Sequence, residues 1–228
     1  YVDCPAGPRQ LSRGLVRTRI GDLAVNIVPG VACVRARDAA PDIMRGEETE
    51  LLGLLASDRL DGAPVVALPG THTKWVRIHD GRVMEFMTAM SGEIYDRLTA
   101  AGLLSSIVEG PASDGAAFRE GVRTAAERML GLGTLLFGAR ARVLRGALDR
   151  RDAGAYLRGL LIGSEISDAL TLFPETRDAT IPLVGSAPVC ALYQAALAEM
   201  GIASRPTPSA DVIARGFLEI DMLHRAMP

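Results

Sequence analysis

The sequence predicts an α/β fold, because short apolar runs of strand length alternate with long stretches of helical pattern. Residues 65–68 read Val-Val-Ala-Leu and are ended by Pro69-Gly70, a pair that fixes one φ angle and frees the next. Residues 180–201 contain an apolar strand, a Gly-Ser turn and a long helix. Residues 116–148 and 156–170 are helical in pattern. Strands separated by helices are typical of α/β proteins.

The composition limits the kinds of partner. Of the 228 residues 48% are hydrophobic, enough for one large or two modest cores. Lys and Arg number 25 against 27 Asp and Glu, so the net charge of −2 does not favour nucleic acid or anionic membranes as principal partners. Cys4, Cys33 and Cys190 lie far apart beside apolar residues, which is typical of buried thiols in a reducing compartment. No apolar run of membrane-spanning length and no leader is present, so we expect a cytoplasmic protein.

The first part of the chain predicts strands rather than catalytic groups. Residues 1–19 are rich in Pro, Gly and Arg and have the composition of a connector, with one short strand at 15–17. Residues 23–28 and 31–34 are apolar and flank Pro29-Gly30. We therefore expect two strands joined by a turn, both buried in a sheet.

Residues 42–55 predict a helix whose first turn is crowded with carboxylates. Asp42 is expected to cap this helix, and the acidic residues precede an apolar run. Acidic side chains in a first turn are stabilised by the free N–H groups there, and this effect alone could explain them. Glu47 and Glu48 are successive, so their side chains point about 100° apart and only one of them can enter a given site.

A turn rich in hydrogen-bond donors follows the strand at 65–68. It consists of Gly70, Thr71, His72, Thr73 and Lys74. These residues offer backbone N–H groups, two hydroxyls, an imidazole and an ammonium, a set that suits a polyanion such as phosphate. The alternative is a polar β-turn with a surface lysine.

The chain beyond this turn predicts one hairpin and several helices. Residues 75–78 and 82–86 are strands that flank Asp80-Gly81, a hairpin signal, and a helix is expected over 93–101. In the helix that includes residues 156–170, Gly159 and Gly163 lie four residues apart on one face, where another backbone can approach closely. Core packing alone could explain these two glycines. A last helix is expected over residues 209–220.

The unit at 180–201 indicates a nucleotide site. It places Gly185 and Ser186 between a strand and a helix, the arrangement in which α/β sheets bind nucleotides at their edges. Neither Gly-x-Gly-x-x-Gly nor Gly-Lys-Ser/Thr occurs in the sequence. Rossmann and P-loop chemistry are therefore not expected.

Four motifs occur together in a recognisable order: Met-Arg-Gly-Glu-Glu-Thr-Glu-Leu-Leu-Gly at 44–53, Leu-Pro-Gly-Thr-His-Thr-Lys-Trp-Val at 68–76, Gly-Leu-Leu-Ile-Gly-Ser-Glu at 159–165, and Leu-Val-Gly-Ser at 183–186. They resemble the 2-dehydro-3-deoxygalactonokinase family, a branch of the actin-like, ribonuclease H-like superfold of sugar kinases. The resemblance covers the chain from about Leu23 onward. It implies transfer of the γ-phosphoryl group of ATP, with Mg²⁺, to the 6-hydroxyl of 2-dehydro-3-deoxy-D-galactonate in galactonate catabolism.

The resemblance also implies roles for individual residues. The residues expected to bind phosphate in the second lobe are Gly70, Thr71, His72, Thr73 and Lys74. The residues expected to bind the nucleotide are Gly163, Gly185 and Ser186. Glu47, which directly follows Gly46, is expected to be the catalytic base. Side-chain chemistry adds Arg45 as a candidate for binding the carboxylate of the sugar acid, because a guanidinium can hold a 2-keto acid through two hydrogen bonds; the alternative is a surface arginine.

One motif of the superfold is absent from the sequence. Its kinases carry a first-lobe hairpin of the type Asp-x-Gly-Thr-Thr, which holds Mg²⁺ and contacts the β- and γ-phosphates. We therefore expect residues 1–40 to be a first-lobe remnant and connector, residues 41–228 to be a second lobe with the nucleotide-binding elements, and this fragment to be inactive by itself. Two alternatives stay open, a noncatalytic ligand-binding relative and a phosphohydrolase of the same superfold.

Overall fold

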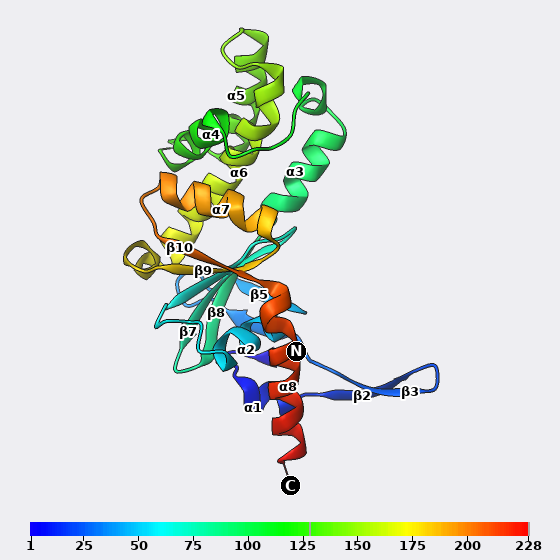
Figure 1. The fold of residues 1–228 in the computed structure, drawn as a ribbon. Helices are drawn as coiled ribbons and strands as arrows, with labels where there is room; N and C mark the ends of the chain where they lie inside the picture. Colours follow the sequence, from blue (N-terminus) through cyan, green and yellow to red (C-terminus); the bar gives the residue numbers. More distant parts are fainter. Residues whose placement is uncertain (128, 228) are drawn as a thin grey trace.

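The computed structural model describes residues 1–127 and 129–227 and has an α/β architecture built on a five-stranded mixed sheet (Figure 1). The strand order is β10-β9-β6-β7-β8. Strands β10, β9 and β6 are parallel, whereas β6, β7 and β8 form an antiparallel meander. The strands are β6 (Val65–Leu68), β7 (Thr73–His79), β8 (Arg82–Ala89), β9 (Ile181–Gly185) and β10 (Ser204–Pro208).

Helices cover the sheet on both faces (Figure 1). One side holds α3 (Ser91–Ala100), α4 (Ala116–Ala126), α5 (Leu132–Leu144), α6 (Arg150–Leu172) and α7 (Ala187–Glu199), with the short 3-10 helices η1 (Ser105–Ile107) and η2 (Pro174–Asp178). The other side holds α1 (Pro8–Arg13), α2 (Glu47–Ala56) and α8 (Ser209–Arg225). No described helix has the length and apolar character to cross a membrane.

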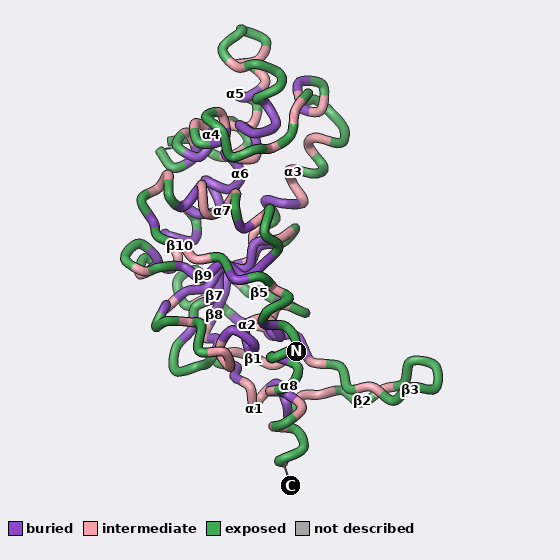
Figure 2. The backbone as a smooth tube through the Cα atoms, in the orientation of Figure 1, coloured by how far each residue is buried: buried purple, intermediate pink, exposed green. Residues whose placement is uncertain are grey.

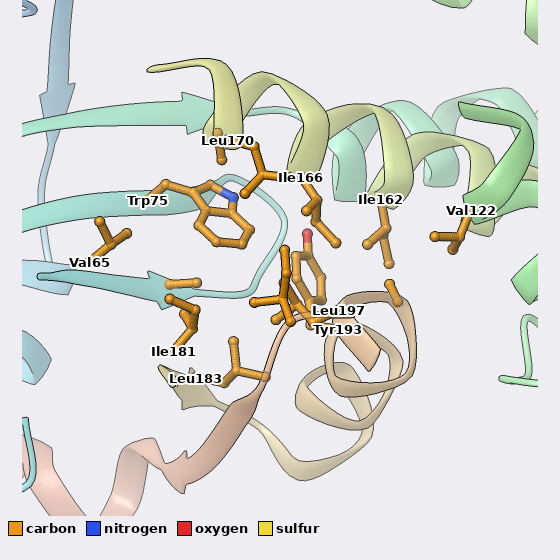
Figure 3. Packing of buried hydrophobic residues seen from close by; sticks show 14 of the residues in the cluster. Val65, Trp75, Val122, Ile162, Ile166, Leu170, Ile181, Leu183, Tyr193 and Leu197 are labelled. Atoms are coloured by element: carbon orange, nitrogen blue, oxygen red, sulfur yellow. The ribbon is translucent and has the colours of Figure 1, made fainter. Parts of the chain in front are cut away.

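The alternation of side chains along the strands creates a core on each face of the sheet. Val65 and Trp75 point into the core beneath α6 and α7 (Figure 3), whereas Val66 and Val76 point into the core beneath α2 and α8. All four side chains have no exposed surface. A sheet buried on both faces explains why residues 65–68 are continuously apolar instead of alternating with polar residues. The centre of the sheet is purple in Figure 2, and β6 and β9 are buried at every residue.

The two glycines at 159 and 163 pack α6 against α4. A Cβ atom at Gly159 would lie 2.0 Å from the carbonyl oxygen of Phe118, and one at Gly163 would lie 2.8 Å from that of Val122. These distances are too short for any side chain, so the backbones of the two helices touch. This contact explains both glycines by packing.

The N-terminal part forms a second sheet and a projecting arm. The sheet has the order β1-β4-β5, with β1 (Val2–Asp3), β4 (Val31–Val34) and β5 (Pro41–Met44). The arm is the antiparallel pair β2 (Val16–Ile20) and β3 (Leu23–Ile27), which extends away from the body of the protein (Figures 1 and 2). The prediction of a buried strand after residue 23 is wrong, because β3 pairs only with β2 and Leu23 is 66% exposed.

The predicted cap at Asp42 is also wrong. Asp42 lies in β5, where its carboxylate accepts hydrogen bonds from the N–H of Thr88 at 2.7 Å and from Arg35 at 3.0 Å. Helix α2 begins at Glu47, and its N-cap is Gly46 with a φ angle of 111°. Glycine adopts this φ angle without a steric penalty, so the chain can turn sharply from β5 into α2. Because β5 pairs with β4, a sheet crosses the expected lobe boundary near residue 40, and the lobe assignment stays a prediction.

Strand β10 was not predicted. Pro206 and Pro208 interrupt its pattern, and proline cannot donate to a sheet ladder. The strand is tolerated because β10 is at the edge of the sheet and pairs only with β9. The predicted strand at 75–78 begins earlier, at Thr73, so two residues of the donor-rich turn belong to β7.

Candidate active site

Three parallel strands end at the same edge of the central sheet and bring two sequence motifs together. Ala67 of β6 pairs with Leu183 of β9, and Gly185 of β9 pairs with Pro208 of β10. The turn after β6 and the Gly185-Ser186 turn are therefore neighbours. A Cβ atom at Gly185 would lie 3.0 Å from the carbonyl oxygen of Pro69, which shows how closely the two turns approach.

The N-terminus of α7 lies at this edge as well. Ser186 is its exposed N-cap residue, with no hydrogen bond from its side chain to the helix. The first N–H groups of a helix have no partners within the helix, and the helix dipole favours negative charge there. Crevices at the carboxyl ends of parallel strands are where α/β folds place their ligands.

The donor-rich turn does not point all of its side chains the same way. Thr71 and His72 are exposed, and the space around Gly70 is open where a Cβ atom would stand. His72 contacts Glu93 at 2.7 Å, and this hydrogen bond lowers the pKa of the Glu93 carboxyl. Thr73, in contrast, has no exposed surface, and its hydroxyl lies 2.7 Å from that of Tyr193.

Lys74 faces the start of α2. Its Nζ atom lies 2.7 Å from Oε1 of Glu47 and donates to the carbonyl oxygen of His72 at 3.0 Å. The Lys74 side chain is only 6% exposed. The second carboxylate oxygen of Glu47 is buried without a hydrogen-bond partner among the described residues. The predicted base and the predicted phosphate-binding cation are therefore adjacent.

The remaining carboxylates of the α2 first turn have different surroundings. Glu48 is turned away and buried, it accepts the N–H of Gly46 at 2.7 Å, and burial raises its pKa to about 7. Glu50 lies one turn after Glu47 on the same helix face. It bonds Ser209 at the start of α8, and burial raises its pKa. We did not single out Glu50 from the sequence, although its spacing of three from Glu47 was a usable signal.

A cavity of about 490 Å³ opens beside the Lys74–Glu47 pair. Its lining includes Arg45, Glu47, His72, Lys74, Thr88 and Glu93. The guanidinium of Arg45 lies 4.7 Å from the centre of the Tyr1 ring, a cation–π contact that leaves its hydrogen-bond donors available. The cavity therefore places two cations beside carboxylates, and the cations can bind an anionic group of a small ligand.

Comparisons with known proteins identify the family of the chain. The sequence model of the 2-keto-3-deoxy-galactonokinase family matches residues 1–220. A protein of Rhizobium meliloti (strain 1021) that is assigned as a 2-dehydro-3-deoxygalactonokinase is 36% identical over 219 residues, which are 95% of this chain and 70% of the relative. The chain belongs to the 2-keto-3-deoxy-galactonokinase family. The resemblance noted in the sequence is thereby confirmed.

Two further relatives support the family assignment. The 2-dehydro-3-deoxygalactonokinase of Escherichia coli (strain K12) is 32% identical over 204 residues, 88% of this chain and 65% of the relative. A crystal structure assigned to a 2-dehydro-3-deoxygalactonokinase of Sinorhizobium meliloti superposes with a TM-score of 0.85 at 36% identity, covering 99% of this chain and 73% of that one. The chain thus spans 65% to 73% of the length of these relatives.

The predicted nucleotide residues of this kinase chain are not all at the site. Gly185 and Ser186 lie at the sheet edge, next to the donor-rich turn. Gly163 is buried against Val122 of α4, away from the residues that line the cavity. Its packing role is evident, and its nucleotide role stays a prediction.

A kinase family implies ATP as a substrate, and the residues at the sheet edge fit a polyphosphate. Open space at Gly70 leaves room for a ligand, and the Lys74 ammonium and the N-terminus of α7 favour negative charge. The described residues contain no group of three or more His, Cys, Asp or Glu side chains placed to hold a metal ion. The Mg²⁺ that the resemblance implies therefore has no such cluster of ligands among the described residues.

Proposed function

We propose that this protein transfers the γ-phosphoryl group of ATP to the 6-hydroxyl of 2-dehydro-3-deoxy-D-galactonate. The observation that carries the proposal is the contact of Glu47 with Lys74 at the cavity, beside the carboxyl edge of the sheet. The identity of the proposed substrate is inferred from the names of the relatives. The proposal includes a cytoplasmic location, where ATP is available.

Glu47 has the surroundings of a general base. Lys74 holds its Oε1, and the Glu47 side chain is 26% exposed at the cavity, where its carboxylate is proposed to accept the proton of the attacking hydroxyl. Phosphoryl transfer depends mainly on the alignment of the two substrates and on stabilisation of the charge that develops on the phosphoryl group. A positioned base also orients the attacking hydroxyl and accepts its proton. Glu48 cannot share this role in the same pose, because its carboxylate is turned to the N–H of Gly46.

Lys74 and the turn before it are proposed to bind the transferred phosphoryl group. Lys74 is the only lysine in a sequence that otherwise uses arginine as its cation. A lysine ammonium is a compact point charge, whereas a guanidinium is a wide planar fork. The confined site between Glu47 and the His72 carbonyl suits the smaller cation. Backbone N–H groups and the Thr71 hydroxyl can add donors on the open side of the turn.

Arg45 and the Gly185-Ser186 turn complete the proposed site. Arg45 lines the cavity and is proposed to bind the carboxylate of the sugar acid through its guanidinium. Gly185 and Ser186 are proposed to border the nucleotide at the N-terminus of α7. ATP supplies the phosphoryl group, and these residues orient the two substrates so that the hydroxyl and the γ-phosphate meet beside Glu47.

The proposal is tested by following the fate of the phosphate. The protein expressed from its complete gene is incubated with ATP and the sugar acid, ADP release is measured, and ³¹P NMR identifies the ester. A 6-phosphate ester formed in step with ADP is the expected result. Release of inorganic phosphate without an ester would instead indicate a phosphohydrolase, and binding of both compounds without ADP release would indicate a noncatalytic ligand-binding relative.

A further inference from the structure

A buried polar cluster lies beneath the donor-rich turn and has no role in the proposed chemistry. Its centre is Glu165 of α6, which is 3% exposed within an otherwise apolar core. The indole N–H of Trp75 donates to Glu165 at 2.7 Å, and the hydroxyl of Tyr193 lies 2.9 Å from its Oε2. The hydroxyl of Ser91, at the start of α3, donates to the same carboxylate oxygen. In Figure 3 the Tyr193 hydroxyl points toward α6.

The directions of these hydrogen bonds follow from the chemistry of the groups. When Glu165 is ionised its carboxylate only accepts hydrogen bonds, so the Tyr193 hydroxyl is then the donor of the hydrogen bond between them. The Tyr193 oxygen then accepts from the hydroxyl of Thr73, which lies 2.7 Å away. The Thr73 oxygen in turn accepts the N–H of Gly70 at 3.3 Å. A single chain of hydrogen bonds therefore runs from Gly70 in the turn to Glu165 in the core.

The start of α3 connects the other side of the turn to the same carboxylate. Ser91, which donates to Glu165, is followed by Gly92, whose Cβ position lies 2.5 Å from the carbonyl oxygen of Gly70. The N–H of Glu93 donates to the carbonyl oxygen of Thr71 at 3.1 Å. Packing and hydrogen bonds from α3 thus hold Gly70 and Thr71 of the turn in place.

We propose that Glu165 and Tyr193 are positioning residues that set the shape of the phosphate-binding turn through Thr73. The inference rests on the proposed function, because it concerns the turn that would hold the transferred phosphoryl group. It assigns to Thr73 the role of an internal link rather than of a phosphate ligand. The hydroxyl of Thr73 has no exposed surface, and both its donor and its acceptor capacity are used inside the protein.

The position of the cluster explains why a turn needs such support. Electrostatic stabilisation of a transition state depends on donors that are already in place when charge develops. Gly70 and Thr71 have open space on the ligand side and receive no support from that direction. Four elements, β7, α3, α6 and α7, meet at Glu165, so the turn is tied to the rigid part of the fold.

Amide hydrogen exchange tests the inference without any assay of activity. Tyr193→Phe removes the hydroxyl that links Thr73 to Glu165 and keeps the ring. The matched control is Tyr156→Phe, a second buried tyrosine whose hydroxyl bonds Thr124 at 3.4 Å. We expect Tyr193→Phe to speed exchange at residues 70–74 by about 10-fold, since one buried hydrogen bond contributes roughly that factor. Unchanged exchange in this turn, or an equal rise in Tyr156→Phe, would overturn the inference.

Kinetics separate an internal link from a phosphate ligand. Thr73→Val should lower kcat by about 10-fold with the KM of the sugar acid within about two-fold, and Thr73→Ser, which keeps the hydroxyl, should restore turnover. Because Thr73 and Tyr193 act in one chain, the double variant Thr73→Val/Tyr193→Phe should be no slower than the slower single variant. If Thr73 contacts phosphate directly, the two losses multiply and the inference fails. A protein without kinase activity would refute the proposed function alone, because the exchange measurement still decides this inference.

Discussion

The Nζ atom of Lys74 lies 2.7 Å from Oε1 of Glu47, which joins the end of one strand pair to the first turn of a helix from the preceding part of the chain. Both side chains are largely shielded from water, so their attraction is stronger than that of a surface ion pair. Each also holds the other in place before a substrate arrives. Glu47 and Lys74 therefore form the part of the site on which the sharpest predictions depend.

Replacing Glu47 by Gln should lower turnover by roughly 10²–10⁴-fold, the usual contribution of a positioned base. The fold and nucleotide binding should persist, because the amide keeps the shape of the side chain. Glu48→Gln is the matched control and should have far less effect, since Glu48 points to the N–H of Gly46. Steady-state kinetics of both variants, in the protein from its complete gene, make the comparison. Equal losses would mean that the acidic first turn only complements the helix dipole.

Replacing Lys74 by Arg or Met should lower kcat by about 10²–10³-fold and change the KM for ATP less, because the ammonium stabilises charge that develops in the transition state. Arginine should not substitute for lysine, since its planar fork does not fit a site that is 6% exposed. A defect confined to KM would contradict this role. An independent measurement is acylation of Lys74 by an amine-reactive reagent, mapped by mass spectrometry, which bound ATP should slow.

Replacing Gly185 by Ala should weaken ATP binding by about 10-fold, or about 1.4 kcal/mol. The new methyl group would stand 3.0 Å from the Pro69 carbonyl oxygen and 3.2 Å from Sγ of Cys190, and it would displace the turn. Gly133→Ala is the control, because among the described residues no atom outside the adjacent part of its own helix lies within 4 Å of its Cβ position. Isothermal titration calorimetry gives both affinities. An unaltered affinity in Gly185→Ala would remove this turn from the nucleotide site.

The stability of the fold should decrease as pH rises from about 4.5 to about 7. Burial raises the pKa of Glu165 to about 7. Hydrogen bonds from Ser91, Trp75 and Tyr193 and the charge of Arg158 act in the opposite direction, but burial has the larger effect on this pKa. The folded protein therefore binds a proton that the unfolded chain has already lost in this interval, and ionisation opposes folding. Glu48, whose pKa burial also raises to about 7, acts in the same direction.

Denaturant midpoints between pH 5 and pH 8 measure this effect. Glu165 should contribute a slope of up to about 1.4 kcal/mol per pH unit, and Glu165→Gln should remove that part. The same slope in wild type and variant would show that Glu165 does not titrate there. Carboxyls with a lowered pKa, such as Glu93, become protonated only below this pH range. Their titration therefore does not affect the slope measured between pH 5 and pH 8.

Local sequence determined much of the architecture. The apolar run at 65–68, the break at Pro69-Gly70 and the strand before Gly185 are formed as predicted, because turn chemistry and hydrophobic pattern act over a few residues. The motifs were also sufficient for the family. Glu47 and Glu48 point apart as their succession in a helix requires, since helix geometry alone sets that angle.

Only the tertiary structure decided which elements face one another. A repeating pattern shows that a strand has a buried face but not what covers it, so the exposed arm at β3 and the edge strand β10 could not be foreseen. The contact of Lys74 with Glu47 depends on packing between β7 and the start of α2. Likewise, Thr73 is turned inward because Tyr193, 120 residues further along the chain, provides its partner. Such pairings arise from strand register and helix packing over long sequence separations, which local residue preferences do not encode.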